Sequence, residues 1–231
     1  MPQARPTAPA SQPEKPKLAP PPEFQEGDLS RMVATDLIRI LGEAGSSEFQ
    51  KAKACQRIGE LGAKEAVPAL AALLPDPHLG AYARYGLEPI TDGSADDALR
   101  AALPKLKGTQ LIGVINSIGK RRDAKASPAL ARMINDPDPD VARAAAAALG
   151  SIGGESSAKT LQEALGRTKG MTRMAVADAC LVCAERLLAA NARDQALALY
   201  AHLSRPEIPS PVRLGAMQAI IREETATGRP R

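Results

Sequence analysis

A five-residue motif that recurs along the chain restricts its possible folds more than any other feature. The motif places an apolar residue and glycine on either side of one variable position, as in Leu149-Gly150-x-Ile152-Gly153. Other copies are complete or partial: Ile58-Gly59-x-Leu61-Gly62, Ile115-Asn116-x-Ile118-Gly119 and Leu87-Glu88-x-Ile90-Thr91. The last position falls at residues 62, 91, 119 and 153, in steps of 29, 28 and 34. A period of this length is typical of helical repeat proteins.

A second pattern follows each copy of the motif. A leucine within a short apolar segment recurs at Leu70, Leu99, Leu130 and Leu161, in steps of 29, 31 and 31 residues. Two patterns that advance together indicate a repeating unit of two helices, in which Gly62, Gly119 and Gly153 take equivalent positions. Because such a unit buries its apolar face only against its neighbours, the sequence predicts an all-α, right-handed α-solenoid of stacked antiparallel helix pairs.

The segment 136–153, DPDPDVARAAAAALGSIG, indicates how one helix of a unit is formed. Asp138 is a good N-cap, and Pro139 suits the first helical position because its missing N–H has no partner there. Five alanines at 144–148 continue the helix, and we expect Gly153 to end it in a left-handed C-cap. Small side chains also let neighbouring helices approach closely. Ala146→Leu should therefore overpack the stack, at a cost of roughly 1–3 kcal/mol.

The repeats divide the chain into three parts. Residues 1–25 are predicted to be a disordered Pro/Ala-rich spacer of polyproline-II character, with a ligand for aromatic grooves as the alternative. Residues 26–224 form the solenoid of about five helix pairs with capping helices, and 225–231 a flexible tail. The predicted pairs are 47–61 with 64–74, 78–89 with 95–107, 109–119 with 124–135, 139–150 with 156–166, and 171–190 with 193–204. Single helices at 28–42 and 210–224 flank them.

The last predicted helix has no second helix to cover it. Its free face would be apolar, because a repeat of this kind buries its core only against the next one. We therefore expect the polypeptide to continue past Arg231 or a partner to dock at this end.

Two of these segments resemble a known family. AVPALAALLPDP (66–77) and ASPALARMINDPDPDVARAAAAALGSIG (126–153) resemble HEAT repeats, in the short form of phycobilin-lyase-type repeat proteins. The resemblance extends over about 47–220, and 184–203 is similar to a tetratricopeptide helix pair. It implies a non-catalytic scaffold or adaptor that binds a protein or peptide. A bilin-lyase-like enzyme or enzyme subunit is the alternative that the same resemblance implies.

Candidates for catalysis or metal binding are few in this sequence. His78 and His202 are separated by 124 residues and are interpreted as helix-surface residues. Cys180 and Cys183 form a C-x-x-C in the middle of a predicted helix, where neither a redox pair nor a zinc site is expected. We interpret them as buried structural thiols and expect no catalytic residue, no metal site and no cofactor. Tyr82 and Tyr85, three residues apart, are interpreted as packing residues, with a ligand platform as the alternative.

The charged residues of the second helices are the candidate partner-binding site. We expect these helices to line the concave face of the solenoid. Residues that should point into it are Arg100, Lys105, Arg132, Lys159, Gln162 and Glu163. Such a face suits an acidic protein or peptide. Nucleic-acid binding through phosphate contacts is a weaker alternative, because 30 Lys and Arg against 26 Asp and Glu leave a net charge of only +4.

Three arginines were assigned a structural role. Arg143, Arg173 and Arg213 occupy similar positions in successive units, and we expect their stems to pack between repeats.

The sequence contains no apolar stretch near the ~18 residues that a membrane helix requires. It also has no apolar core of a signal peptide after Met1. The default expectation is therefore a cytoplasmic protein without a membrane contact. A native start upstream of this sequence would instead allow export, for example to the periplasm.

Overall fold

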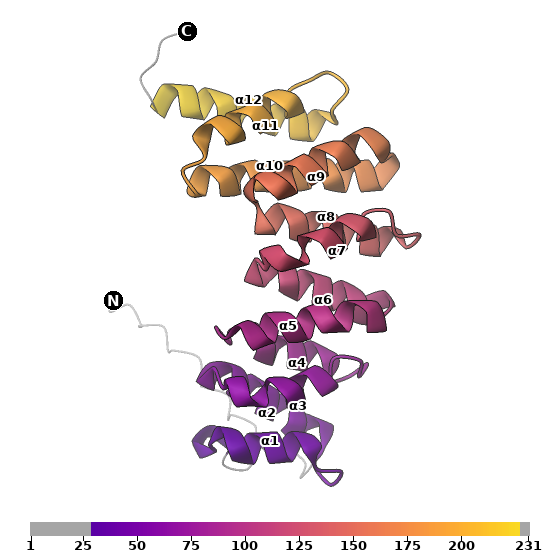
Figure 1. Ribbon diagram of the computed structural model, residues 1–231, viewed down its shortest axis with the longest axis vertical. Coiled ribbons are helices and arrows are strands. Elements are labelled where there is room, and N and C mark those ends of the chain that lie inside the picture. Colours follow the sequence, from indigo (N-terminus) through magenta and orange to yellow (C-terminus); the bar gives the residue numbers. More distant parts are fainter. Residues whose placement is uncertain (1–28, 227–231) are drawn as a thin grey trace, which may run out of the picture.

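The computed structural model describes residues 29–226, in which every regular element is a helix (Figure 1). The α-helices are α1 (Ala34–Gly42), α2 (Glu48–Leu61), α3 (Val67–Ala72), α4 (Gly80–Leu87), α5 (Gly93–Ala102), α6 (Gly108–Arg121), α7 (Ser127–Met133), α8 (Pro139–Ile152), α9 (Gly154–Arg167), α10 (Gly170–Ala189), α11 (Arg193–Leu203) and α12 (Ser210–Ala226). Short 3-10 turns η2 (Leu29–Arg31), η3 (Lys64–Ala66), η4 (Leu103–Lys105) and η5 (Ala124–Ala126) adjoin them. The predicted all-α solenoid is confirmed.

The two ends of the chain lie outside the described residues. The predicted spacer at 1–25 lies outside the described residues, as does 227–231 of the predicted tail. The remainder of that tail, 225–226, belongs to α12. Among the helices of residues 29–226, none is long and apolar enough to cross a membrane.

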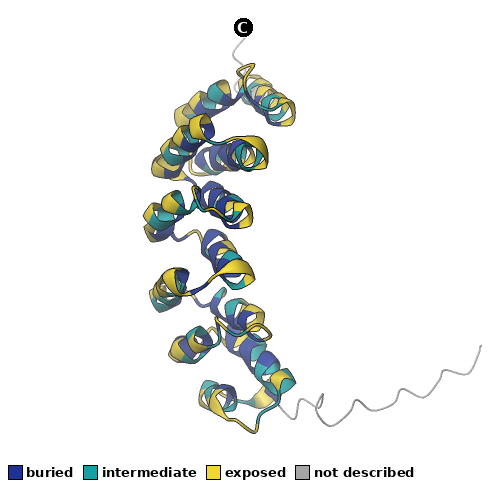
Figure 2. Cartoon of the chain, turned by 90° about the vertical axis from the view of Figure 1, so that its right-hand side faces the viewer, coloured by how far each residue is buried: buried dark blue, intermediate teal, exposed yellow. Residues whose placement is uncertain are grey.

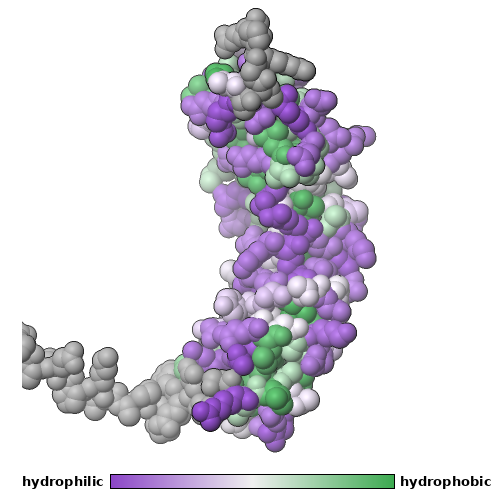
Figure 3. Space-filling model, turned by 90° about the vertical axis from the view of Figure 1, so that its left-hand side faces the viewer, coloured by the Kyte–Doolittle hydropathy of each residue, from purple (hydrophilic) through white to green (hydrophobic). Residues whose placement is uncertain are grey.

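The helices stack in two layers that curve together (Figures 1 and 2). The even-numbered helices α2, α4, α6, α8, α10 and α12 form the inner layer on the concave side. The odd-numbered helices form the outer layer on the convex side, and each outer helix is followed in the chain by an inner one. Figure 3, from the opposite side, shows the same curvature and a largely hydrophilic surface.

Glycine and alanine in the inner helices account for this curvature. A Cβ built on Gly150 would lie 2.6 Å from the carbonyl oxygen of Ala179, and one on Gly119 would lie 2.8 Å from the Cα of Ala148. The backbones of α6, α8 and α10 are therefore already in contact, at the short end of helix spacings. The outer helices lack such contacts and lie further apart, so the inner layer becomes the concave one.

The prediction that the second helices line the concave face is therefore wrong. The second helices of the predicted pairs are α3, α5, α7 and α9, which lie on the convex side. The first helices, with their glycines and alanines, line the concave face. The physical reason is helix spacing, since the layer with the smaller side chains must be the shorter one.

The repeated leucines lie between the two layers. Leu70, Leu99, Leu130 and Leu161 are all fully buried. Fully buried residues of the inner helices recur in the same rhythm, at Ile58, Leu87, Ile118, Leu149 and Cys180. Their steps of 29, 31, 31 and 31 residues show that one copy of the sequence motif was aligned one helical turn too early.

This alignment changes the roles of the glycines. Gly119 lies inside α6 and makes a close helix contact, so it is equivalent to Gly59 rather than to Gly62. The left-handed residue that ends α6 is Arg122, with φ 57° and ψ 41°, whereas Gly62 ends α2 with φ 64° and ψ 28°. The predicted equivalence of Gly62 and Gly119 is therefore wrong.

The ends of α8 follow their predicted chemistry in part. Asp138 accepts a hydrogen bond from the N–H of Asp140 at 2.9 Å, and Pro139 is the first helical residue, as predicted. Gly153 has φ 73° but ψ −162°, which lies outside the left-handed helical region. It joins α8 to α9 without a loop, so the predicted left-handed C-cap is wrong while the need for a positive φ is confirmed.

The last helix exposes an apolar face, as predicted. Val212, Ala216 and Ala219 pack into the core, whereas Leu214 and Ile221 on the opposite side of α12 are more than half exposed. That the chain continues or a partner docks there stays a prediction.

Candidate functional site

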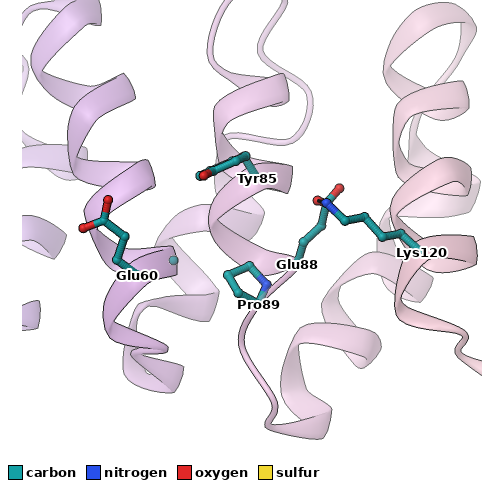
Figure 4. Close-up of a pocket in the computed structure, with 6 residues that line it drawn as sticks. Glu60, Tyr85, Glu88, Pro89 and Lys120 are labelled. Carbon is teal, nitrogen blue, oxygen red and sulfur yellow. Dashed lines mark hydrogen bonds and ion pairs between the residues drawn. The ribbon is translucent and has the colours of Figure 1, made fainter.

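A pocket of about 280 Å³ lies on the concave face where α2, α4 and α6 meet (Figure 4). Gly59 and Glu60 of α2 form one side, and Lys120 of α6 forms the other. Tyr85 of α4 lies between them, above Pro89. The pocket thus has an aromatic and aliphatic centre with charged groups at its rim.

Tyr85 and Tyr82 expose their rings on this face. Tyr85 is 54% exposed and Tyr82 41%, so the interpretation of both as packing residues is wrong. The chain has only three tyrosines and two phenylalanines, and aromatic side chains on a surface are enriched at binding sites. The exposure of Tyr85 could have been predicted from the sequence, because Tyr85 lies on the opposite side of the helix from the buried Leu87.

A carboxylate bridge holds the rim of the pocket in place. Glu88 accepts hydrogen bonds from the hydroxyl of Ser117 at 2.8 Å and from the ammonium of Lys120 at 2.5 Å. The hydrogen bond and charge of Glu88 raise the pKa of Lys120. On the other side, Glu60 pairs with Arg57 at 2.8 Å. The rim therefore presents both signs of charge, and each of these groups has a partner.

The segment GKRRDAK (119–125) contributes to this site and fixes it from behind. The side chain of Arg121 is only 8% exposed and forms a two-pronged pair with Asp96, at 2.6 and 3.0 Å. It also donates to the carbonyl oxygens of Leu87, Glu88 and Ile90 at the end of α4. Arg121 thus places a cation at the C-terminal end of the preceding inner helix, where the helix dipole favours positive charge.

The six predicted partner-binding residues do not form one site. Arg100 and Arg132 line a cavity of about 430 Å³ on the outer layer, together with Lys125, Leu103 and Met133. The other four lie elsewhere on outer-layer elements, on η4 and α9: Lys105, Lys159, Gln162 and Glu163. The concave groove that they were expected to line is formed by other helices.

Arg100 is a structural residue as well as a lining one. It forms ion pairs with Asp97 on its own helix and with Asp123, whose side chain is only 6% exposed. Asp123 also accepts the backbone N–H of Lys125 at 3.1 Å and so begins η5. Arg100→Glu would face these two carboxylates and should therefore destabilise the chain.

The three structural arginines behave differently from one another. Arg173 donates to the carbonyls of Leu165 at 2.8 Å and Glu207 at 3.1 Å, which links two outer-layer segments. Arg213 donates to the carbonyl of Pro206 at 3.0 Å. Arg143 pairs with Asp140 on its own helix, and its side chain is 35% exposed, so its predicted packing between repeats stays a prediction.

The cysteines and histidines are not gathered into a site within the described part of the chain. Burial raises the pKa of Cys55 and Cys180 to about 12 and that of Cys183 to about 11. The interpretation of Cys180 and Cys183 as buried thiols is confirmed. His78 is exposed at the start of α4 and His202 half-buried on α11. In residues 29–226, no three side chains of the metal-binding types come together.

Comparison with known proteins identifies the repeat. Residues 111–180 match the family model described as HEAT repeats, so the recognition of HEAT repeats is confirmed for this region. A search of curated proteins finds no match.

Solved structures of helical repeat proteins resemble this chain at low sequence identity. The complex of CpcE and CpcF of phycocyanin lyase from Nostoc sp. PCC7120 contains a chain that is 19% identical, covering 83% of this chain and 75% of that one, with a TM-score of 0.42. An engineered protein is 15% identical, with coverage of 86% and 97% and a TM-score of 0.48. Human deoxyhypusine hydroxylase in complex with glycerol is 17% identical, with coverage of 85% and 77% and a TM-score of 0.41.

Proposed function

We propose that this HEAT-repeat chain is a scaffold that binds an extended segment of a partner protein along its concave face, with the pocket at Tyr85 as the anchor. The observation that carries the proposal is that two of the chain's five aromatic side chains are exposed on this face. An aromatic ring above an apolar floor gives a partner side chain a large contact at a low entropic cost.

The charges of the concave face support a segment of mixed polarity. Exposed side chains on the inner helices include Glu60, Asn116, Lys120, Asp178 and Glu185. Both signs are present, and acidic groups outnumber the lysine in this set. The predicted preference for an acidic partner is therefore not carried over to this face. A proline or aliphatic side chain against Tyr85 and Pro89, with polar neighbours, fits the pocket.

The proposed role is binding rather than catalysis. Its support is that the thiols are buried and have raised pKa values, so that nucleophilic thiolates are scarce at neutral pH. The pocket residues that carry charge are joined in ion pairs within its rim. These pairs suit a surface that orients a polypeptide.

Peptide selection with a single-site control tests the proposal. Random peptides displayed on phage are selected against the full chain, and the affinities of the enriched peptides are measured by calorimetry. Tyr85→Ala should weaken binding at least tenfold, because it removes the anchor. Both this variant and the control Lys159→Ala, on the exposed side of α9, should retain the circular dichroism and melting of the wild type.

Two results would contradict the proposal. One is a set of enriched peptides that bind Tyr85→Ala as tightly as the wild type. The other is that the selection enriches no peptide whose binding depends on the concave pocket.

A further inference from the structure

The cavity on the outer layer offers a second surface of different chemistry. It lies between the segment α5–η4 and the segment η5–α7, at about 430 Å³. Its apolar floor consists of Leu103, Pro104, Ala126, Ala129 and Met133. Leu103 and Ala126 belong to the core, whereas Pro104 is exposed and Ala129 and Met133 are partly so.

The cavity exists because the outer helices are spaced by the layer's curvature. Inner helices α6 and α8 touch through Gly119 and Ala148, while α5 and α7 make few direct contacts with each other. The 3-10 turns η4 and η5 lie between them and form the bottom of the gap. The spacing of the outer helices thus leaves room for the cavity between these two segments.

Two cations at the rim are open to an anionic ligand. Three lining residues are cationic, and the fourth charged one, Asp136, is a carboxylate that accepts the backbone N–H of Asp138 at 2.9 Å. Arg100 is bound by the two carboxylates of Asp97 and Asp123 and so offers no free charge to a ligand. Lys125 and Arg132 are exposed, and their side chains form no hydrogen bond or ion pair with any described residue. Two free cations therefore face the cavity beside an aliphatic floor.

We propose that this outer cavity binds an acidic, leucine-containing peptide segment of a partner protein. An aliphatic side chain of the segment lies on Met133 and Leu103. A neighbouring carboxylate is bound by the guanidinium of Arg132, which can engage both of its oxygens, and a second one by Lys125. The proposal is independent of the concave pocket, since the two sites share no lining residue.

Nucleic acid is the less favoured occupant of this surface. Phosphate-backbone binding uses a row of cations along a groove, with aromatic side chains for single strands. Here two free cations flank an aliphatic floor, and no aromatic residue lines the cavity within the described residues. The test therefore includes a nucleic-acid probe as a separate arm.

Fluorescence anisotropy with three labelled probes tests the proposal on the full chain. The first probe is a dodecapeptide that alternates glutamate and leucine, the second has glutamine in place of each glutamate, and the third is a single-stranded DNA of twelve nucleotides. The variant is the double reversal Lys125→Glu with Arg132→Glu. The matched control is Lys159→Glu with Arg167→Glu, two exposed cations of α9.

The expected result is that the acidic peptide binds the wild type and loses at least tenfold in affinity with the double reversal. The control pair and Tyr85→Ala should bind it as the wild type does, which separates this site from the concave one. The carbon-13 methyl signal of Met133 should shift on titration, since its side chain lines the cavity.

Three results would overturn the proposal. The first is equal binding of the acidic and glutamine peptides, which would remove charge from the recognition. The second is no measurable binding of the acidic peptide, or binding that the double reversal leaves unchanged. The third is tighter binding of the DNA, lost in the same double reversal, which would make the surface a nucleic-acid site.

Discussion

Replacement of Gly150 by alanine is the sharpest test of how the inner layer is packed. A Cβ at this position would lie 2.6 Å from the carbonyl oxygen and 3.0 Å from the Cα of Ala179 on α10. Both atoms belong to the backbone, so a change of rotamer cannot relieve the overlap. The two helices must move apart, and the neighbouring contacts in the layer must move with them.

The magnitude follows from two opposing effects. Alanine is favoured over glycine within a helix by up to about 1 kcal/mol. Overpacking costs about 1–3 kcal/mol, and the upper part of this range applies because a backbone is displaced. Gly150→Ala should therefore lower the free energy of unfolding by about 1–2 kcal/mol. For a chain of this size that corresponds to a decrease in Tm of roughly 2–8 °C.

Gly166→Ala is the matched control, because it is the same chemical change in a helix where the space is open. A Cβ on Gly166 of α9 meets no atom within 4 Å, so only the helix preference remains and stability should rise by a few tenths to about 1 kcal/mol. Urea denaturation and thermal melting, both followed by circular dichroism, measure the two variants. Equal or greater stability of Gly150→Ala relative to the wild type would refute the close approach of α8 and α10.

Three other predictions concern the core and the linking residues. Ala146→Leu, at a fully buried position of α8, should lower the free energy of unfolding by roughly 1–3 kcal/mol. Ala147→Leu, on the exposed side of the same helix, should change it by less than about 0.5 kcal/mol. Similar denaturation midpoints for the two variants would contradict the burial of Ala146. Arg173→Ala leaves two carbonyl groups without their donor and should lower the free energy of unfolding by about 1–3 kcal/mol. Arg143→Ala, which removes a single ion pair at the surface, should lower it by about 0–1 kcal/mol. Unchanged melting of Arg173→Ala would refute a stabilising link from Arg173 to Leu165 and Glu207. The buried thiols have pKa values of about 11 to 12 in the folded chain, against 9.0 for a free thiol. Their contribution to stability is therefore complete below pH 9 and falls above it by about 1.4 kcal/mol per thiol per pH unit, because the thiols of the unfolded chain ionise first. Urea titrations at pH 8 and pH 10 should show a smaller loss of stability for a triple Cys→Ala variant than for the wild type.

Much of the fold could be predicted because local signals are strong in this sequence. Apolar periodicity located the helices, and the capping chemistry of Asp138 and Pro139 located the start of α8. The repeated leucine register was predicted correctly because those residues all lie between the layers. The motif alignment failed at Gly119, where a glycine that permits a close helix contact was taken for one that ends a helix.

The binding surfaces could be predicted only in part, because they depend on which layer is shorter. The alanines of α8 already contained that information, since small side chains shorten the spacing between helices. Arg100 and Arg132 line one cavity, but it lies on the outer layer and not on the concave face for which they were predicted. The exposure of Tyr85 required the placement of α4 between α2 and α6, which single-helix periodicity does not supply.

The unequal packing of the two layers determines how this molecule can bend. The inner layer cannot shorten, since the backbones of α6, α8 and α10 already touch at Gly119 and Gly150. The outer layer contains a cavity of about 430 Å³ between the segments α5–η4 and η5–α7. We therefore expect bending of the solenoid to change the spacing of the outer helices, while the spacing of the inner helices stays constant. A ligand bound between α5 and α7 would fix the spacing of these two helices and with it the curvature of the solenoid.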